Sequence, residues 1–446
     1  GITISSSGNV DSIGIITATS FKGTFDGSLS SSADATVNSV TVGKGANSVA
    51  GNTVVGETAL DAATTGGNNT AVGKAALGAN TTAAYNVAVG SGALTTNTTG
   101  ANNTAVGGVA LENNTTASNN TGLGNEALRA NTTGAQNTAV GSLALDANTT
   151  ANSNTAIGYD SLGANTTGAQ NTAVGRGTLS SNTTAANNTA VGTDALNDNT
   201  TGEYNTAVGA YSLDANTTTS NNTAIGYAAM GANTAGYSVA AVGTNALASN
   251  TTGAQTNAMG HGALGANTTG NFNNAFGYNA LATNTTSSNN SAFGHSALAA
   301  NTTGTSNSAF GSTALDANTT GSYNTAMGTG ALSACTTGAS NIAIGQACLS
   351  ALTTGDYNVA VGRAVLVGTN ASRNTAIGYY AMSNNTTGSY NTAVGYTANI
   401  ANTTGNYNTS VGDQALAQCT TGDSNTAIGA NALDACTIGH SNTAVG

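Results

Sequence analysis

The sequence contains little charge, few aromatic residues, and neither proline nor tryptophan. Of its 446 residues 6% are charged and 4% aromatic, whereas a globular domain usually carries about 25% charged residues. Disordered chains tend to be charged and rich in proline, and collagen needs proline together with glycine at every third position, so neither class fits. Gly, Asn, Thr, Ala and Ser dominate instead, and they predict a mostly neutral polar surface.

The charges that are present, and the lack of long apolar runs, exclude two kinds of partner. Eighteen acidic residues against seven basic ones give a formal charge of −11, and binding along nucleic acid would need the opposite sign. No stretch approaches the roughly 20 apolar residues of a membrane-spanning helix. We therefore expect no nucleic acid partner and no membrane span. The chain begins at Gly1 without a secretory signal, so we expect a processed or partial chain.

A 17-residue repeat organises nearly the whole chain. The glycine that closes each N-T-A-V-G, here called the repeat glycine, recurs every 17 residues from Gly56 to Gly362. One interval of 16 leads to Gly378, and the spacing of 17 then resumes to Gly446. A fixed period of this length is the signature of a repeat architecture. We expect residues 1–42 to form a connector segment and residues 43–446 a repeat shaft of about 23 coils, irregular at 363–378.

The apolar residues of the repeat predict the fold. The residue before each repeat glycine is always apolar, and the fourth residue after it is Leu in 20 of 23 copies. No 3.6-residue stripe exists, which argues against helices, and Gly and Asn-Thr-Thr-Gly turns favour two short strands per unit. The sequence therefore predicts an all-β, parallel β-solenoid or β-roll whose coils stack about 4.8 Å apart. The predicted core columns include Val72, Leu77, Val89, Leu94, Phe276, Phe293 and Phe310.

Asparagine occupies two further columns. Asn69 and Asn137 lie four residues before a repeat glycine, and Asn80 and Asn148 lie seven residues after one. Stacked amides can bond to one another and to turn backbone, so we predict structural Asn ladders. The Asn-Thr-Thr turns also match glycosylation sequons, and their regular recurrence at a turn favours the ladder interpretation.

The predicted core is thin for a single chain. Two large apolar residues per unit can hardly offset an ordering cost of about 1–2 kcal/mol per residue. We therefore expect a homo-oligomer, with either the Val/Ile column or the Leu column facing a shared axis and the other filling the coil. The Val/Ile column carries larger side chains in five consecutive coils, from Met259 through three Phe to Met327. We interpret these residues as an aromatic ladder that packs the core.

The repeat carries no recognisable catalytic or metal-binding pattern. Three His residues have no carboxylate or cysteine at triad or ligand spacing, and no Cys-x-x-Cys pair exists for zinc. Cys419 and Cys436 lie one coil apart, within disulfide reach in Cα distance, but their parallel side chains favour free thiols. We expect no enzyme activity, no cofactor and no metal. Exposed tyrosines at one turn are candidate contacts for a glycan or protein receptor: Tyr85, Tyr204, Tyr323, Tyr390 and Tyr407.

These motifs resemble two known groups of proteins. N-T-A-V-G, N-T-A-I-G and the earlier N-S-V-A-G resemble the head motifs of trimeric autotransporter adhesins of the YadA/Hia type. The longer unit is similar to repeats of bacteriophage tail-fibre proteins, and residues 14–27 resemble their connector segments. The resemblance implies an intertwined or side-by-side homotrimeric fibre.

The tail-fibre resemblance implies the shaft of a virion fibre for host attachment, joined to other fibre or virion proteins at its ends. The alternative is a bacterial surface adhesin, placed extracellularly or on the cell surface. A further alternative is an ice-binding solenoid, because stacked Thr can form flat arrays, although the dominant Thr pair is adjacent and lies at a turn.

Overall fold

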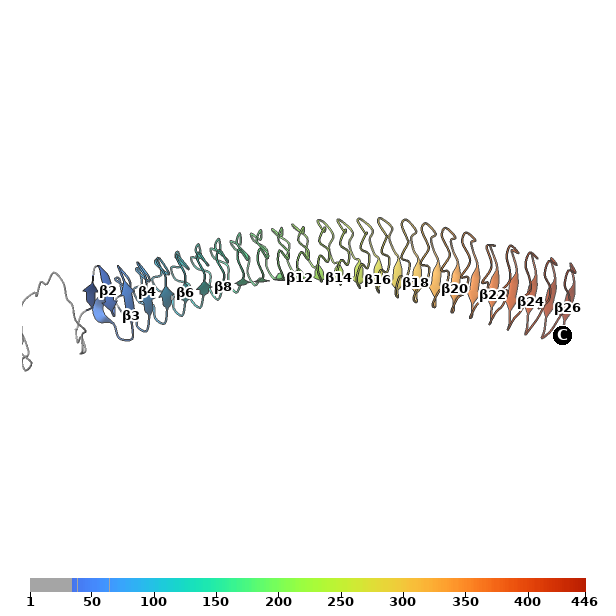
Figure 1. Cartoon of the computed structure of the whole chain (residues 1–446), viewed down its shortest axis with the longest axis horizontal. Coiled ribbons are helices and arrows are strands. Elements are labelled where there is room, and N and C mark those ends of the chain that lie inside the picture. The colour runs from blue at the N-terminus through green and yellow to red at the C-terminus, as the bar shows by residue number, and fades with distance from the viewer. Residues whose placement is uncertain (1–33, 38, 64) are drawn as a thin grey trace, which may run out of the picture.

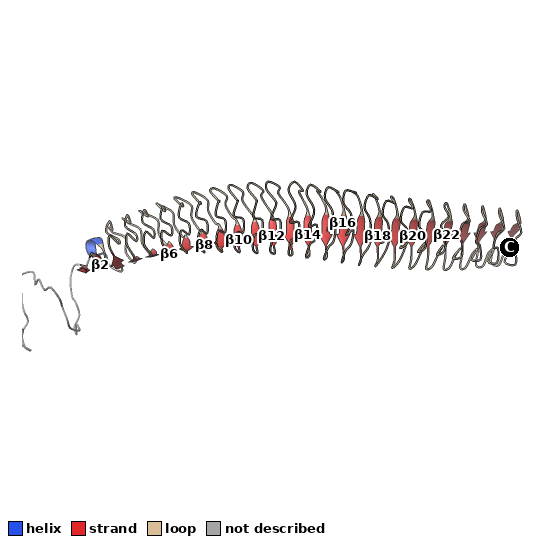
Figure 2. Cartoon of the chain, turned by 45° about the horizontal axis from the view of Figure 1, so that its top comes forward, coloured by secondary structure: helices blue, strands red, loops and turns tan. Residues whose placement is uncertain are grey.

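The chain is one long, gently bowed rod built from a single stack of coils (Figure 1). The computed structural model describes residues 34–37, 39–63 and 65–446. Its strands lie on one side of the rod and loops form the remainder of each coil, with one short 3₁₀ turn, η1 (Ala46–Ser48), near the start (Figure 2). Residues 1–33 of the predicted connector, which include residues 14–27, lie outside the described residues.

Twenty-six short strands belong to one sheet among the described residues. They are β1 Ala35–Val37, β2 Val40–Gly43, β3 Thr53–Gly56, β4 Thr70–Val72, β5 Val87–Val89, β6 Thr104–Val106, β7 Thr121–Leu123, β8 Thr138–Val140, β9 Thr155–Ile157, β10 Thr172–Val174, β11 Thr189–Val191, β12 Thr206–Val208, β13 Thr223–Ile225, β14 Ala240–Val242, β15 Asn257–Met259, β16 Asn274–Phe276, β17 Ser291–Phe293, β18 Ser308–Phe310, β19 Thr325–Met327, β20 Ile342–Ile344, β21 Val359–Val361, β22 Thr375–Ile377, β23 Thr392–Val394, β24 Thr409–Val411, β25 Thr426–Ile428 and β26 Thr443–Val445.

The strands from β3 to β26 pair in chain order, each parallel to the next. Their register is one repeat, so that Thr70 pairs with Val87, and between β21 and β22 it shortens to Val359 with Thr375. The predicted all-β parallel solenoid of about 23 coils and 17-residue repeats is therefore confirmed. At a strand spacing of about 4.8 Å the stack measures on the order of 110 Å.

Each coil contains one strand, so the expectation of two strands per unit is wrong. On the side opposite the strand, Ala75 and Leu77 have φ of 58° and 52°, and the equivalent positions repeat these values along the rod. Left-handed residues break the extended conformation that a strand requires. Bonding between coils continues there all the same, because the Leu77 N–H donates to the Ala93 carbonyl at 3.0 Å.

The parallel stack begins after an antiparallel turn. β1 pairs with β2, and β2 with β3, in antiparallel fashion, so the expected boundary at residue 43 falls at the end of β2. The Asp34 carboxylate accepts the Lys44 and Gly45 N–H groups, each at 2.6 Å. These bonds tie the start of the described chain to the turn that leads toward the first coil.

The interior of each coil is filled by one chain alone. Leu77 and Leu94 are fully buried, as is the central Ala of most strands, for example Ala71. Successive strand residues point to opposite faces, so the residue after that Ala points outward.

The core assignment of the outward column is therefore wrong within the chain. Five of the predicted core residues lie on the outer face and are partly exposed: Val72, Val89, Phe276, Phe293 and Phe310.

The repeat glycine is required where neighbouring coils approach each other most closely. Gly141 has φ of 135°, and a Cβ built on it would lie 2.4 Å from the Gly158 carbonyl oxygen. The same approach recurs from coil to coil at this corner. A side chain at this position would force two coils apart, which explains why the column admits only glycine.

Candidate interaction surfaces

The first Asn column ties each coil to the next through the backbone. The Asn69 Oδ1 accepts the Asn86 N–H at 2.9 Å, and its Nδ2 donates to the Ala83 carbonyl at 2.9 Å. Asn137 repeats this arrangement, donating its N–H to Asn120 Oδ1 at 2.9 Å. These amides are buried, and each satisfies backbone groups that a turn leaves without a partner.

The second Asn column is a ladder of side chains. Asn148 Nδ2 donates to Asn131 Oδ1 at 2.8 Å, and Asn97 Nδ2 donates to Asn80 Oδ1 at 3.3 Å. Every amide of the unbroken ladder is fully buried. Because the sequon nitrogens lie inside the coil, the folded rod offers them no access to a glycosylating enzyme.

Cysteine interrupts this second ladder. Cys335 stands where the ladder needs an amide donor, and the Oδ1 of the preceding Asn318 is buried without a hydrogen-bond partner. All four cysteines are free thiols. Burial raises the pKa of Cys335 and Cys419 to about 11 and that of Cys348 to about 12. Since the thiolate is the reactive form, these buried thiols are poor nucleophiles at neutral pH.

A single polar residue interrupts the Leu column. Asn399 is fully buried, and neither its Oδ1 nor its Nδ2 has a hydrogen-bond partner. The apolar interior divides at this point into two clusters, one ending at Ala398 and the other beginning at Ala415. The interior is therefore weakest at this coil.

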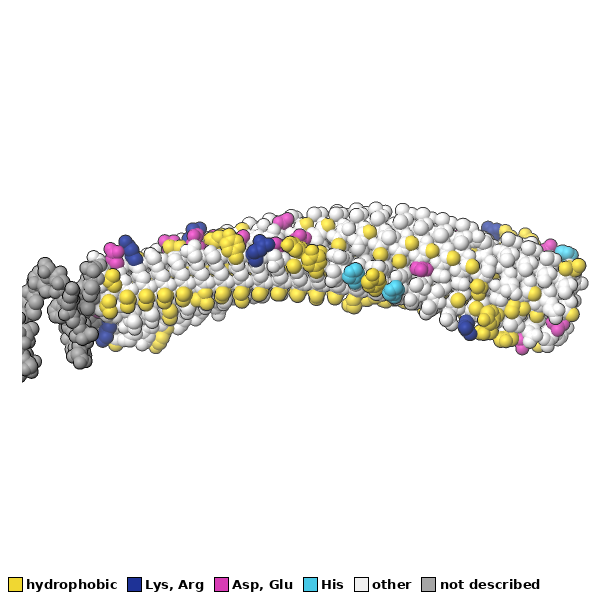
Figure 3. All heavy atoms as spheres, in the orientation of Figure 1, with side chains coloured by type: hydrophobic (Ala, Val, Ile, Leu, Met, Phe, Trp, Pro, Cys, Tyr) yellow, Lys and Arg dark blue, Asp and Glu magenta, His cyan; other side chains and the backbone are white. Residues whose placement is uncertain are grey.

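The residues before the repeat glycines form a continuous apolar stripe, here called the outer column. It contains Val106 and Ile157, exposed by 37% and 39%, and reaches Met259 and the three Phe. Figure 3 shows hydrophobic side chains in a row over the strands of the N-terminal half, on a surface with few charges. Side chains of the outer column can be buried further only against another molecule.

The Phe residues stack on one another along the outer column. The ring centroids of Phe276 and Phe293 lie 4.7 Å apart, and those of Phe293 and Phe310 lie 4.8 Å apart, with interplanar angles of 6°. Beside them the step from Val242 to Met259 leaves a hollow of 120 Å³. The Phe ladder predicted from the sequence exists, but it lies on the surface and not in the core.

The five candidate tyrosines share one corner of the rod, five residues before a repeat glycine, and all are exposed. Their backbone lies in the left-handed region, as at Tyr85 with φ of 62°. The structure brings only Tyr390 and Tyr407 together, with ring centroids 4.9 Å apart and rings inclined by 13°. Tyr85, Tyr204 and Tyr323 make no aromatic stack with another described residue. A separate column, directly after the repeat glycine, stacks His261, Tyr278 and His295 at 5.3 Å spacing.

Two arginines of the 16-residue coil lie against tyrosine rings. The Arg373 Cζ lies 5.2 Å from the Tyr390 centroid, and the Arg363 Cζ lies 5.7 Å from that of Tyr379. Counting from the repeat glycines would have found both, since Arg373 aligns with the Tyr390 column and Arg363 with the Tyr379 column.

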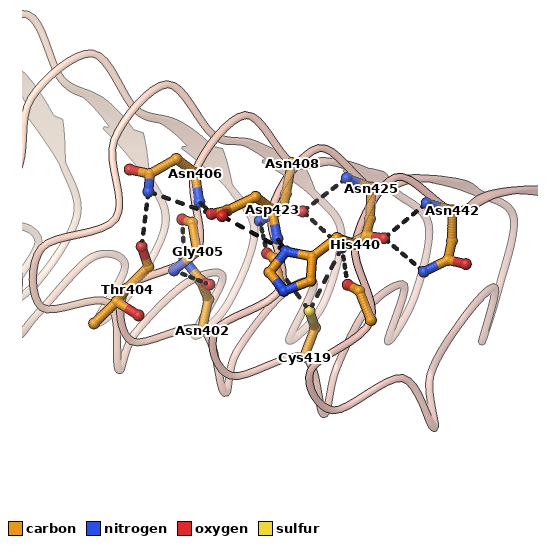
Figure 4. A network of polar contacts seen from close by, with 12 residues as sticks. Asn402, Thr404, Gly405, Asn406, Asn408, Cys419, Asp423, Asn425, His440 and Asn442 are labelled. Carbon is orange, nitrogen blue, oxygen red and sulfur yellow. Dashed lines mark hydrogen bonds and ion pairs between the residues drawn. The ribbon is translucent and has the colours of Figure 1, made fainter.

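Side chains at the C-terminal coils hydrogen-bond to backbone groups of their own coil or of a neighbouring one (Figure 4). The His440 Nδ1 accepts the Asp423 N–H at 2.9 Å. A nitrogen that accepts a bond carries no proton, so its 3.6 Å separation from the Asp423 carboxylate is not an ion pair in this geometry. Asn408, Asn425 and Asn442 continue the first Asn ladder beside it.

Over the described residues, no group of three His, Cys, Asp or Glu side chains is placed to hold a metal ion. No helix in that part of the chain is long and apolar enough to cross a membrane. Comparisons with protein-family models and with curated proteins found no match to this chain.

Proposed function

We propose that the chain forms the shaft of a homotrimeric fibre, most closely the tail fibre of a bacteriophage, and serves host attachment without catalysis. The observation that carries this proposal is the outer column, an apolar stripe along the whole stack outside an interior that is already filled. In this proposal the shaft holds attachment groups away from a virion, and other fibre or virion proteins join its ends.

The outer column supports association between copies of this chain. Burying the remaining third of a Val or Ile side chain contributes roughly 0.5–1 kcal/mol, scaled from about 1.5–3 kcal/mol for complete burial. Over two dozen coils the total of roughly 12–24 kcal/mol matches or exceeds the roughly 4–15 kcal/mol that association costs. A partner must carry apolar groups at the same pitch along the same length, and a second copy of the chain does so.

A bacterial surface adhesin is the second candidate, and the exposed tyrosine corner favours it. Such side chains are suited to contact with a receptor along the shaft. The ice-binding alternative receives less support. A Thr column does face outward two residues before the outer column, but residues of other kinds replace it without interruption from Ala240 to Ser308.

The two leading candidates differ in what the fibre is attached to. Cryo-electron microscopy of native particles, with an antibody raised against the purified chain, would locate it. We expect label along fibres that project from virion tails. Label confined to a bacterial cell envelope would contradict the tail-fibre proposal and support the adhesin, and label on no filamentous structure would contradict both.

A further inference from the structure

From the first repeat glycine, Gly56, onward, the basic residues are paired with acids except in one coil. Lys74, Arg129 and Arg176 each make an ion pair with a carboxylate. Arg363 and Arg373 make none with any described residue, and both are exposed. They belong to the single 16-residue coil. One coil thus carries two cations without a carboxylate partner, at separate corners, in a chain whose formal charge is −11.

A comparison with Arg176 shows how the pairing is lost. Arg176 and Arg363 occupy the same repeat position, directly after the repeat glycine. The Arg176 Nη2 lies 2.7 Å from Asp194 Oδ2, on the next coil. The coil after Arg363 has tyrosines at the corresponding positions instead of an acid. The Arg363 Nη1 donates to the Tyr379 hydroxyl at 3.3 Å. The charge of Arg363 thus remains uncompensated, and the same holds for Arg373.

Arg373 is part of a ladder across four consecutive coils, formed by Tyr357, Arg373, Tyr390 and Tyr407 and here called the tyrosine–arginine ladder. Its guanidinium lies between two rings, 5.8 Å from the Tyr357 centroid and 5.2 Å from that of Tyr390. Its Nη1 donates to the Tyr390 hydroxyl, and Tyr390 stacks on Tyr407. The rings before and after it flank the guanidinium along the rod, and its other N–H donors make no hydrogen bond to a described residue.

The ladder ends in a ring whose outer face is uncovered. The next coil supplies Ser424 at the tyrosine position, which is too small to cover Tyr407. Accordingly the exposed fraction rises from 44% at Tyr390 to 61% at Tyr407. The same holds at the other end, where Ser340 precedes Tyr357 and leaves it 59% exposed. The ladder therefore presents a cation, a line of hydroxyl-bearing ring edges, and an open aromatic face at each end, all along the fibre axis.

We propose that the tyrosine–arginine ladder binds an acidic polysaccharide. Arg373 takes a carboxylate of the polymer through paired N–H donors. The tyrosine hydroxyls hydrogen-bond sugar hydroxyls, and the open face of Tyr407 packs on the apolar face of a sugar ring. The proposal rests on the attachment role above and deepens it, since it assigns a ligand class to one position of the shaft.

Charge favours a polysaccharide over nucleic acid at this ladder. Duplex nucleic acid carries one charge per about 1.7 Å and is held by many cations at once. The ladder offers one cation, and acids such as Asp356 and Asp413 lie on nearby coils. A polymer with carboxylates spaced one per sugar or fewer meets the guanidinium with less repulsion from those acids.

The test measures binding of purified full-length chain to four acidic polysaccharides: polygalacturonate, alginate, hyaluronate and polysialic acid. Methyl-esterified polygalacturonate serves as the neutral counterpart, and single-stranded oligothymidine represents nucleic acid. We expect at least one acidic polysaccharide to bind. Arg373→Gln should weaken that binding about tenfold or more, and Tyr407→Ala should weaken it several-fold. If polygalacturonate binds, its methyl-esterified form should bind about tenfold more weakly.

Arg176→Gln is the matched control, because it removes one positive charge from an arginine that Asp194 already pairs. It should leave binding unchanged. An equal loss in Arg176→Gln and Arg373→Gln, no binding to any of the four polysaccharides, or an equal dependence of oligothymidine binding on Arg373 would each overturn the proposal. Sedimentation of the same samples reports the oligomeric rod independently, so a failed glycan site is distinguishable from a failed fibre.

Discussion

An asparagine inside this rod stabilises or destabilises it according to its column. Where amides stack with amides, as at Asn97, the side chain donates to the coil before and accepts from the coil after. Where an amide replaces Leu, as at Asn399, no partner exists for either polar atom. A buried polar group without a partner costs about 1–3 kcal/mol. The same residue type therefore has opposite effects in two columns, one four and the other seven residues after the repeat glycine.

Asn399→Leu should therefore stabilise the rod by roughly 2–4 kcal/mol, because it removes the cost of burying an unpaired amide and adds the burial of an apolar side chain. Urea unfolding followed by circular dichroism measures the shift. Asn97→Leu is the matched control and should destabilise by about 1–3 kcal/mol, because it leaves ladder partners unpaired. A destabilising Asn399→Leu would mean that the amide has a partner in solution.

The buried thiol of Cys348 gives a pH dependence with a definite sign. Burial raises its pKa from 9.0 to about 12, so the folded chain holds this proton more tightly than the unfolded chain does. The contribution to stability is complete below pH 9 and is lost as the pH rises from 9 towards 12. Thermal midpoints measured across that range should fall more steeply for the wild type than for Cys348→Ala, which restores the residue of most other coils. Parallel curves would show that this thiol is not buried.

At the scale of the coil, the corner at the repeat glycine sets how closely coils can stack. Gly141→Ala should lower stability by roughly 2–5 kcal/mol, because overpacking and a left-handed backbone both penalise the new Cβ. Gly330→Ala is the control, since Gly330 has φ of 65° and open space around it. It should cost about 1–2 kcal/mol from the backbone alone. Equal losses in denaturant midpoint would refute the close approach of coils.

The period and the parallel stacking of coils could be predicted from the sequence, because one register repeats along the chain. The number of strands per coil could not, since nothing in a Leu predicts the left-handed φ that Leu77 adopts. Which of the two apolar columns faces outward was left open, although the strand pattern decides it. Ala71 and Val72 are neighbours in a strand, so only one of them can point inward.

The inferred need for a partner rested on a core too thin for one chain, and the structure changes that premise. Buried amides such as Asn80 and small residues such as Ala76 fill the coil beside Leu77. The column alignment of the tyrosine–arginine ladder could be counted from the sequence, but its ring contacts could not. The ladder depends on Arg373 aligning with Tyr357 and Tyr390 across the 16-residue coil.

For the whole molecule, the outer column is the feature that calls for other chains. Val174→Asp combined with Val191→Asp would place two charges in the stripe on adjacent coils. If the stripe is an interface between copies, the charges lose their hydration there and the assembly should dissociate. Gln170→Asp adds a charge on the same rod outside the stripe and should leave the assembly intact. Size-exclusion chromatography with light scattering distinguishes the variants, and an unchanged mass for the double variant would place the interface elsewhere.

The most direct measurement is the mass of the wild-type chain in solution at micromolar concentration, by analytical ultracentrifugation. One chain has a mass of 42.8 kDa. The homotrimeric shaft predicts a single elongated species of about three times that mass, with a frictional ratio far above that of a globular protein. A species of 42.8 kDa that persists at all concentrations tested would contradict the account.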